Sequence, residues 1–315
     1  MRLWAATGDA VARLDEDGGR WTVALSLEGS GAQCLSRDPG DPDTVYVGLR
    51  EHGLRKTSDG GETWRDVELP EPGVFSIAVS PVDGAVYAGC EPSRLFRSND
   101  AGDSWRALDA LLELPSQPTW RFPPRPWTSH VRWIAPSPHD AELLLVGIEL
   151  GGLMRSADGG ASWADHRPGA QRDVHSVVWH QRERGRAYEA GGGGSAFSVD
   201  AGDSWTPADQ GRDRDYTWAV ATDPDDADRW WLSASTGPFA AHGERHSQAR
   251  IYRRDGDAWT AVSDELAAMP YALSVHDGRL FAALGDGTVL ETRDGGDNWA
   301  ELQLEAKLPR LGALG

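Results

Sequence analysis

Short apolar segments alternate with turn-forming residues along the whole chain. Each apolar segment is followed by a cluster of Pro, Asp or Gly, such as Asp38-Pro-Gly-Asp-Pro-Asp43. Runs of about four to eight residues bounded by such clusters are typical of β-strands. Seven segments align through their turns as first strands of a repeated unit: Gln33–Arg37, Phe75–Val79, Arg132–Pro136, His175–Trp179, Trp218–Thr222, Tyr271–Val275 and a stretch near Arg310. The pattern predicts an all-β chain built from a repeat.

An eight-residue motif recurs later in the unit. Its first copy is Thr57-Ser-Asp-Gly-Gly-Glu-Thr-Trp64, with a hydroxyl residue seven, an Asp five and a Gly three positions before the Trp. An Asp at the head of a tight turn accepts hydrogen bonds from backbone N–H groups, and the Gly permits the positive φ that closes the turn. The motif predicts a β-hairpin corner followed by a buried Trp. The Asp residues with this structural role are Asp59, Asp100, Asp158, Asp200 and Asp294.

The motif resembles the Asp-box, or BNR repeat, S-x-D-x-G-x-T-W, of sialidases, xyloglucan hydrolases, sortilin-type receptors and the photosystem II assembly propellers. The resemblance implies a β-propeller of the WD40/YVTN-like kind and leaves the activity open, because the motif is a fold element shared by unrelated functions. Two shorter copies, Asp17-Gly-Gly-Arg-Trp21 and Asp255-Gly-Asp-Ala-Trp259, complete a set of seven corners. Their spacing of about 42 residues, with two longer intervals, predicts a seven-bladed β-propeller of four-stranded blades.

The chain begins in the middle of a blade, because Leu3–Ala6 resembles the second strand of later units and no first strand precedes it. A spare segment, Leu308–Leu314, remains after the last blade and is predicted to supply the missing inner strand. Pairing of the N- and C-terminal segments in one sheet would close the ring and remove two exposed edges. We therefore expect residues 1–315 to form a single propeller domain.

Composition narrows the classes of partner. The chain carries 49 acidic and 31 basic residues, a net charge of -18, which argues against nucleic acid and anionic membrane surfaces. No apolar run approaches the ~18 residues of a membrane span, and no basic and apolar leader begins the sequence, so we expect a cytoplasmic protein. Cys34 and Cys90 have no CxxC partner, so we expect two buried residues instead of a metal ribbon or a disulfide framework.

Two insertions lengthen the repeat, at about residues 113–130 and 236–250. The first follows an outer strand and the second follows a second strand, and in an up-and-down blade both connections lie on the face opposite the Asp-box corners. Both are therefore predicted to cover one mouth of the central channel, where binding sites are usually built. Trp120, Phe122 and Trp127 of the first insertion would either anchor a protein partner or pack back on the blades.

Side chains of an inner strand alternate, so every second residue points into the channel. A water-filled channel needs no particular side chains, yet arginine, histidine, aromatic and acidic residues collect at this mouth of an acidic protein. The aligned positions are Gln33, Phe75, Arg132, His175, Trp218, Tyr271 and Arg310, then His130, Asp173 and Tyr216 two residues earlier, and Arg50, Glu91 and Glu149 after the second strands. The pattern predicts a polar pocket.

We predict that this pocket binds a small anionic or polyhydroxylated molecule. Arginine pairs with carboxylate or phosphate through two hydrogen bonds, and aromatic rings form stacking walls. The residues predicted to bind substrate are Arg132, Arg310, Arg50, Gln33, Trp218, His130 and Tyr216. The residues predicted to be catalytic are His175, Glu149 and Tyr271, with His175 or Glu149 as acid or base. The interpretation is a glycosidase-like hydrolase or lyase for which no cofactor is predicted.

Two other interpretations stay open. One is a non-catalytic protein-binding or assembly module, as the photosystem II assembly propellers are. The other is an enzyme that uses a divalent metal bound by His130, His175 and Glu149, although neither of these histidines belongs to an HxH or HxxxH pair. The sialidase resemblance transfers no residue roles, because Arg121-Phe-Pro123 follows the third Trp corner, whereas the sialidase Arg-Ile-Pro element precedes the first Asp-box.

Overall fold

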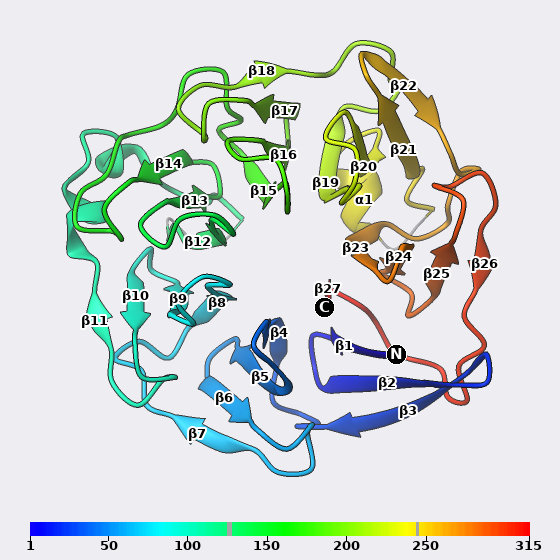
Figure 1. Cartoon of the computed structure of the whole chain (residues 1–315), viewed down its shortest axis with the longest axis horizontal. Helices are drawn as coiled ribbons and strands as arrows, with labels where there is room; N and C mark the ends of the chain where they lie inside the picture. Colours follow the sequence, from blue (N-terminus) through cyan, green and yellow to red (C-terminus); the bar gives the residue numbers. More distant parts are fainter. Residues whose placement is uncertain (125–127, 244–245) are drawn as a thin grey trace.

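A computed structural model of the protein describes residues 1–124, 128–243 and 246–315. Within these residues the strands form seven antiparallel sheets, and Figure 1 shows the sheets arranged as a ring around one axis. Each sheet runs from an inner strand beside the axis to an outer strand at the rim. The seven-bladed β-propeller predicted from the Trp corners is confirmed.

The strands of each blade are given from the inside outward. The first blade consists of β27 (Ala313–Leu314), β1 (Arg2–Ala6), β2 (Val11–Asp17) and β3 (Arg20–Ser26). The second blade consists of β4 (Ala32–Asp38), β5 (Asp41–Leu49), β6 (Gly53–Thr57) and β7 (Arg65–Val67). The third blade consists of β8 (Val74–Val79), β9 (Val86–Cys90), β10 (Leu95–Ser98) and β11 (Arg106–Ala107). The fourth blade consists of β12 (Val131–Pro136), β13 (Leu144–Ile148) and β14 (Gly152–Ser156). The fifth is β15 (Val174–Trp179), β16 (Ala187–Gly191), β17 (Gly194–Ser198), β18 (Thr206–Pro207). The sixth blade consists of β19 (Tyr216–Thr222), β20 (Arg229–Ser235), β21 (Arg250–Asp255) and β22 (Ala258–Ala261). The seventh blade consists of β23 (Pro270–His276), β24 (Arg279–Leu284), β25 (Val289–Thr292) and β26 (Ala300–Glu301).

The fourth blade and the insertions depart from strict regularity. The outer strand of the fourth blade is reduced to the single bridge between Arg155 and Ala164. Two 3-10 helices, η1 (Asp109–Glu113) and η2 (Gln117–Thr119), lie between β11 and β12, and the short helix α1 (Pro238–His242) lies between β20 and β21. None of the helices in the described ranges is long and apolar enough to cross a membrane.

The core is divided among the interfaces between blades. In the described part of the chain, seven apolar clusters each join the facing sides of two neighbouring blades. The second strand of a blade lies between two neighbours, so β9 and β13 are buried along their whole length. This explains why those strands are continuous apolar runs without alternation.

Glycine is required where blades approach most closely. A Cβ on Gly48 would lie 2.7 Å from Val74 of the next blade, and a Cβ on Gly89 would lie 2.5 Å from Val131. Both glycines belong to second strands, near the mouth end where the inner strands converge. Side chains at these positions would push neighbouring blades apart.

The Asp-box corners have the predicted hydrogen bonds. In the first, Asp59 Oδ1 accepts the Thr57 hydroxyl at 2.7 Å and the Thr63 N–H at 3.0 Å, and Oδ2 accepts the Thr63 hydroxyl at 2.5 Å. The Thr57 Oγ1 also accepts the N–H of Gly61, whose φ is +87°. The same set recurs at Asp100, Asp158, Asp200 and Asp294. The Asp carboxylate of each corner is therefore satisfied within its own eight residues.

The ring is closed by pairing of the two ends of the chain. Strand β27 pairs with β1 through Ala313 and Leu314, as predicted, but it is shorter than the expected segment Leu308–Leu314. Pro309 has no N–H to donate to a ladder, and Leu308 and Leu311 are instead buried between the first and seventh blades.

Candidate functional site

Two connected groups of inner-strand residues enclose space along the propeller axis. A cavity of about 730 Å³, which we call the mouth pocket, is lined by residues of several blades and of both insertions. A smaller cavity of about 300 Å³, which we call the channel cavity, is lined by residues of all seven inner strands. Phe122 and Pro124 of the first insertion and Pro238 and His242 of the second line the mouth pocket.

Most of the residues predicted to face the channel line one or both cavities. Those that line the mouth pocket are Gln33, Arg50, Phe75, Arg132, Glu149, Asp173, Tyr216, Trp218, Tyr271 and Arg310. Those that line the channel cavity are Gln33, Phe75, Arg132, His175, Trp218 and Tyr271. His130 is fully buried and lines neither. Strand alternation therefore places these side chains as the sequence alignment indicates, while their roles stay predictions.

Glu149 lies directly after β13 and is the most strongly held acidic group of the mouth pocket. His130 Nε2 lies 2.5 Å from Glu149 Oε2, and Arg132 Nε lies 3.7 Å from the same oxygen. Burial raises the pKa of Glu149, but the His130 hydrogen bond and the Arg132 charge outweigh it and lower the pKa to about 2. Glu149 is thus an ionised carboxylate at neutral pH.

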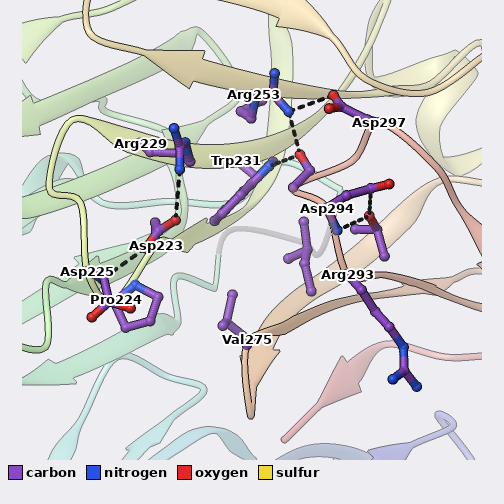
Figure 2. A pocket seen from close by; sticks show the side chains of 14 residues that line it. Asp223, Pro224, Asp225, Arg229, Trp231, Arg253, Val275, Arg293, Asp294 and Asp297 are labelled. Carbon is purple, nitrogen blue, oxygen red and sulfur yellow. Dashed lines mark hydrogen bonds and ion pairs between the residues drawn. The ribbon is translucent and has the colours of Figure 1, made fainter.

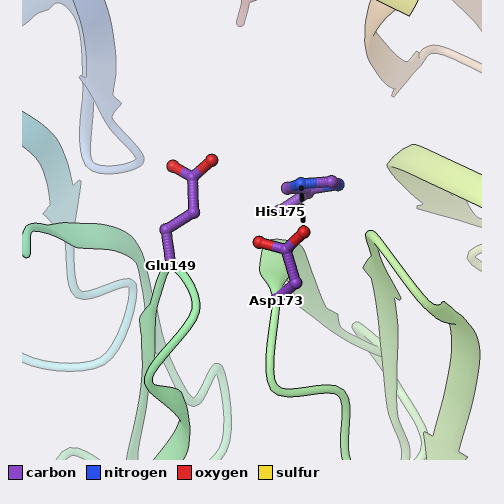
Figure 3. Close-up of side chains that lie close together, drawn as sticks. All are labelled: Glu149, Asp173 and His175. Atoms are coloured by element: carbon purple, nitrogen blue, oxygen red, sulfur yellow. Dashed lines mark ion pairs between the residues drawn. The ribbon is translucent and has the colours of Figure 1, made fainter. Parts of the chain in front are cut away.

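Asp173 and His175 lie two residues apart on the neighbouring blade. Figure 3 shows the Asp173 carboxylate directed at the His175 ring with Glu149 beside them, and Asp173 Oδ2 is 3.6 Å from His175 Nε2. Burial and the negative charge of Glu149 raise the pKa of Asp173 to about 6. Burial lowers the pKa of His175 to about 4, so its imidazole is neutral at pH 7.

Aromatic rings form one wall of the site. The Trp218 ring lies 4.2 Å from the His175 ring and 4.8 Å from the Arg132 guanidinium, measured to the ring centroid. Phe75 stacks on His130 at 3.7 Å. A cation above an indole face is stabilised by the ring quadrupole, so Trp218 helps to hold Arg132 in the cavity.

The second insertion is tied to this wall by hydrogen bonds. His242 Nε2 lies 2.7 Å from the Tyr216 hydroxyl, and His242 Nδ1 lies 3.0 Å from the Tyr271 hydroxyl. The Tyr271 hydroxyl donates to the backbone oxygen of Ala241 at 2.9 Å. Tyr271, a predicted catalytic residue, is therefore engaged with α1.

The remaining predicted binding residues differ in how free they are. Gln33 donates its amide to the backbone oxygen of Val74 at 2.6 Å, so it supports the wall between two blades. Arg50 and Arg310 are exposed, and neither forms an ion pair with another residue of the described ranges. Arg310 lies over the Tyr271 ring, with its guanidinium carbon 5.4 Å from the centroid. Both arginines are available to a ligand.

The first insertion packs partly against the blades. Trp120 is buried in the cluster between the third and fourth blades, and its indole N–H donates to Ser116 at 2.9 Å. Phe122 packs edge-on against His130 at 5.1 Å and lines the mouth pocket. Trp127 lies outside the described residues.

The structure changes the candidate set of metal ligands. Within the described ranges, the donor atoms of Glu149, Asp173 and His175 lie within 4.8 Å of one another. His130, predicted as a ligand, instead directs Nε2 at the Glu149 carboxylate. Alternation had placed Asp173 in the channel but gave it no role, because sequence does not show which blade faces it. His242 stands four residues before His246 in the second insertion, but this spacing did not predict its contacts with the inner strands.

A separate pocket of about 460 Å³ lies on the Asp-box side, between the sixth and seventh blades (Figure 2). Its charges are paired with one another: Arg229 contacts Asp223 at 3.5 Å, and Arg253 contacts Asp297 at 2.9 Å. Asp294 is occupied by its own corner. The contact between Arg253 and Asp297 connects the two blades, and together these pairs leave few free groups for a ligand.

Comparison with known proteins identifies the fold. No protein-family model matches the chain. An ancestral GH74 enzyme is similar with a TM-score of 0.65 and 17% identity, over 95% of this chain and 39% of that one. The GH74 xyloglucanase from Xanthomonas campestris gives 0.66 and 18%, over 96% and 47%. YCF48 bound to a D1 peptide gives 0.58 and 18%, over 86% and 82%.

The chain spans less than half the length of the two GH74 enzymes. At these identities the similarity shows the architecture alone. Together with the hydrogen-bonded corners, it shows that this chain is a seven-bladed Asp-box β-propeller.

Proposed function

We propose that the protein binds a small anionic or polyhydroxylated molecule in the mouth pocket and acts on it as a hydrolase or lyase. The observation that carries the proposal is the gathering of Arg50, Arg132 and Arg310 around one pocket of a protein with a net charge of -18. The volume of about 730 Å³ lies in the range of small-molecule sites.

The side chains suggest how such a ligand would be held. Arg50 and Arg310 would pair with a carboxylate or phosphate of the ligand through charge-assisted hydrogen bonds. Trp218 and Tyr271 would pack against a sugar ring or a similar flat surface. Glu149 and His175 present a carboxylate and an imidazole lone pair to the ligand, but their lowered pKa values make both weak bases. Asp173, whose pKa is raised to about 6, is better matched to proton transfer near neutral pH.

Saccharides are the first ligand class to test, because two solved structures with this architecture are GH74 enzymes. Purified protein would be screened for a shift in melting temperature with neutral oligosaccharides, uronic acids and sialic acids. Any hit would then be assayed for cleavage by product analysis. We expect an acidic saccharide to bind, because the pocket offers three arginines to one ligand.

Matched arginine variants test the location of the site. Arg132→Gln and Arg310→Gln should each weaken binding of the hit at least about tenfold, since each removes a charge-assisted hydrogen bond. Arg182→Gln is the control, because Arg182 is 67% exposed and lines neither cavity. Equal affinity of all three variants and the wild type would contradict the proposal.

A peptide-binding module is the second candidate. Phe239 of α1 is 95% exposed and adjoins Pro238, which lines the mouth pocket. The terminal carboxylate of a peptide would use the same arginines, and a solved structure with this fold, YCF48, is bound to a D1 peptide. Peptides with a free or an amidated C-terminus would be compared by fluorescence anisotropy. Preference for the free carboxylate, lost in Phe239→Ala, would favour this candidate over an enzyme.

A further inference from the structure

One imidazole nitrogen of His175 has no hydrogen-bond partner among the described residues. His175 Nδ1 lies 2.6 Å from the backbone oxygen of Thr217, which can only accept, so Nδ1 carries the hydrogen and Nε2 carries a lone pair. His175 is 1% exposed, and no described residue forms a hydrogen bond with Nε2. A buried lone pair without a partner is destabilising unless something else satisfies it.

That lone pair lies beside the Asp173 carboxylate. Asp173 Oδ2 lies 3.6 Å from Nε2, which is too far for a hydrogen bond. Asp173 Oδ1 is also buried without a partner among the described residues. Glu149 Oε2 is engaged by His130, which leaves its second oxygen for another contact. Electron-rich atoms from two blades therefore face one another, as they do around a cation.

We infer that Glu149, Asp173 and His175 form a binding site for a divalent first-row transition-metal cation at the floor of the mouth pocket. The identity of the molecule on which the cation would act rests on the proposed function. Binding of the cation itself needs no organic ligand. Imidazole nitrogen together with carboxylate oxygen suits Mn²⁺, Co²⁺ or Zn²⁺ better than Ca²⁺ or Mg²⁺.

The spacing of the donors fits such a cation after a small adjustment. Bonds of about 2.0–2.2 Å place two ligand atoms at most about 4.4 Å apart. That limit applies to ligands on opposite sides of the ion, whereas adjacent ligands lie about 3.0–3.5 Å apart. The donor atoms of the three side chains lie within 4.8 Å of one another, so the side chains must move together by on the order of 1 Å to complete the set. Asp173 and Glu149 adjoin strands β15 and β13, which hold both residues on a rigid frame.

The surroundings of the three residues are those of a metal site. A ligating histidine usually donates its other N–H to a carbonyl, and ligating carboxylates accept further hydrogen bonds. His175 donates to Thr217 in this way, and Glu149 is bonded to His130. Arg132, 3.7 Å from Glu149 Oε2, contributes a positive charge that would weaken cation binding and would also hold an anionic ligand beside the cation.

The cation would have open positions toward the mouth pocket. Three protein ligands leave at least one coordination position for water or ligand oxygen. Glu149 and Asp173 line the mouth pocket, whereas His175 lines the channel cavity below it. A cation between them would therefore polarise an oxygen atom of a molecule held by the arginines.

The test is titration of metal-stripped protein with Co²⁺, followed by calorimetry and by visible absorption of the bound ion. We expect one equivalent to bind to the wild type, with absorption bands that differ from those of aqueous Co²⁺. Asp173→Asn and Glu149→Gln should each weaken binding at least about tenfold while circular dichroism stays unchanged, since each removes a charged ligand. His130→Gln tests a positioning residue and should weaken binding by about 10- to 100-fold.

An exposed pair provides the matched control. His246 Nδ1 and Glu265 Oε1 are also 3.6 Å apart, but both side chains are exposed and no third ligand from the described ranges joins them. His246→Gln should bind Co²⁺ as the wild type does. The inference is overturned if the wild type binds neither Co²⁺, Mn²⁺ nor Zn²⁺ at millimolar concentration, or if folded Asp173→Asn binds with unchanged affinity.

Failure of this inference is distinguishable from failure of the proposed function. The saccharide screen would be repeated on metal-stripped protein. A saccharide that binds without any cation, combined with no Co²⁺ binding, overturns the metal site and leaves the proposed function standing. Stoichiometric Co²⁺ binding, combined with no binding of any saccharide, would support the metal site and count against the proposed function.

Discussion

The Tyr216 hydroxyl lies 2.7 Å from Nε2 of His242, a residue of the short helix α1. The other ring nitrogen of His242 contacts the Tyr271 hydroxyl at 3.0 Å. One imidazole therefore connects an insertion to two inner strands, β19 and β23. Two hydroxyl groups of the channel wall thus share a single side chain of α1.

Removal of this imidazole should loosen α1. In His242→Ala both hydrogen bonds are lost, and at about 0.5–1.5 kcal/mol each the Ala241 amide should exchange with solvent about tenfold faster or more. Hydrogen exchange followed by mass spectrometry measures this rate. Phe239→Ala, on the same helix but 95% exposed, should leave the rate unchanged. Equal exchange in His242→Ala and the wild type would show that backbone contacts alone hold α1.

The Asp-box corners should make the protein sensitive to acid. Hydrogen bonds from the Thr63 hydroxyl and N–H lower the pKa of Asp59 to about 2, and the same holds for Asp100 and Asp294. A lowered carboxyl pKa contributes stability that is present above the unfolded pKa of about 3.9 and is lost as the pH falls through about 2.

Asp59→Asn should reveal this contribution. The variant should melt below the wild type at pH 7, and the difference should shrink as the pH falls from 4 toward 2. Asp66→Asn in the same blade is the control, because the Asp66 side chain is 76% exposed on an outer strand. A difference that is independent of pH would mean that turn geometry, not ionisation, determines the stability of the corner.

Buried Glu189 should have the opposite pH dependence. Burial raises its pKa to about 8, and one carboxyl oxygen is without a partner in the described part of the structure. A raised pKa contributes stability that is fully present below the unfolded pKa of about 4.3 and is lost as the pH rises through about 8. Glu189→Gln should therefore become more stable than the wild type by on the order of 5 kcal/mol near pH 9 and differ little at pH 4. Urea unfolding of both proteins between pH 4 and pH 9 measures this difference in stability. Glu62→Gln is the control, because the Glu62 side chain is 70% exposed.

The contact between the first and seventh blades should depend on buried leucines. Leu311 is fully buried beside Leu3 and Phe281. Leu311→Ala should lower the free energy of unfolding by about 2–5 kcal/mol, through lost burial and the cavity that remains. Leu25→Ala, which removes a partly exposed side chain, should cost much less. A loss below about 1 kcal/mol for Leu311→Ala would mean that closure depends on the backbone pairing of β27 alone.

The fold was predictable because its signals are local. In a corner such as Thr57 to Trp64, the Asp59 carboxylate and the Thr57 hydroxyl find their partners within eight residues, so one copy specifies one turn. Repetition of the corners then determines the number of blades. Channel-facing positions such as Arg132 follow from strand alternation, which is also a local property.

The composition of the site was less predictable because it depends on contacts between blades. Whether Glu149 faces Asp173 depends on how far the fourth blade is rotated against the fifth and on the β-bulge between Val174 and Ser176. The position of His242 depends on the conformation of an insertion that has no repeat to align with. Neither quantity is encoded in the spacing of residues along one strand.

The pairing of β27 with β1 has a consequence for biosynthesis. Trp4 and Gly315 exchange two backbone hydrogen bonds, of 2.7 and 2.8 Å, across this sheet. Strand β1 leaves the ribosome early, whereas Ala313 and Leu314 are made after all the other strands. The inner edge of β1 therefore stays unpaired by β27 until translation has reached these residues.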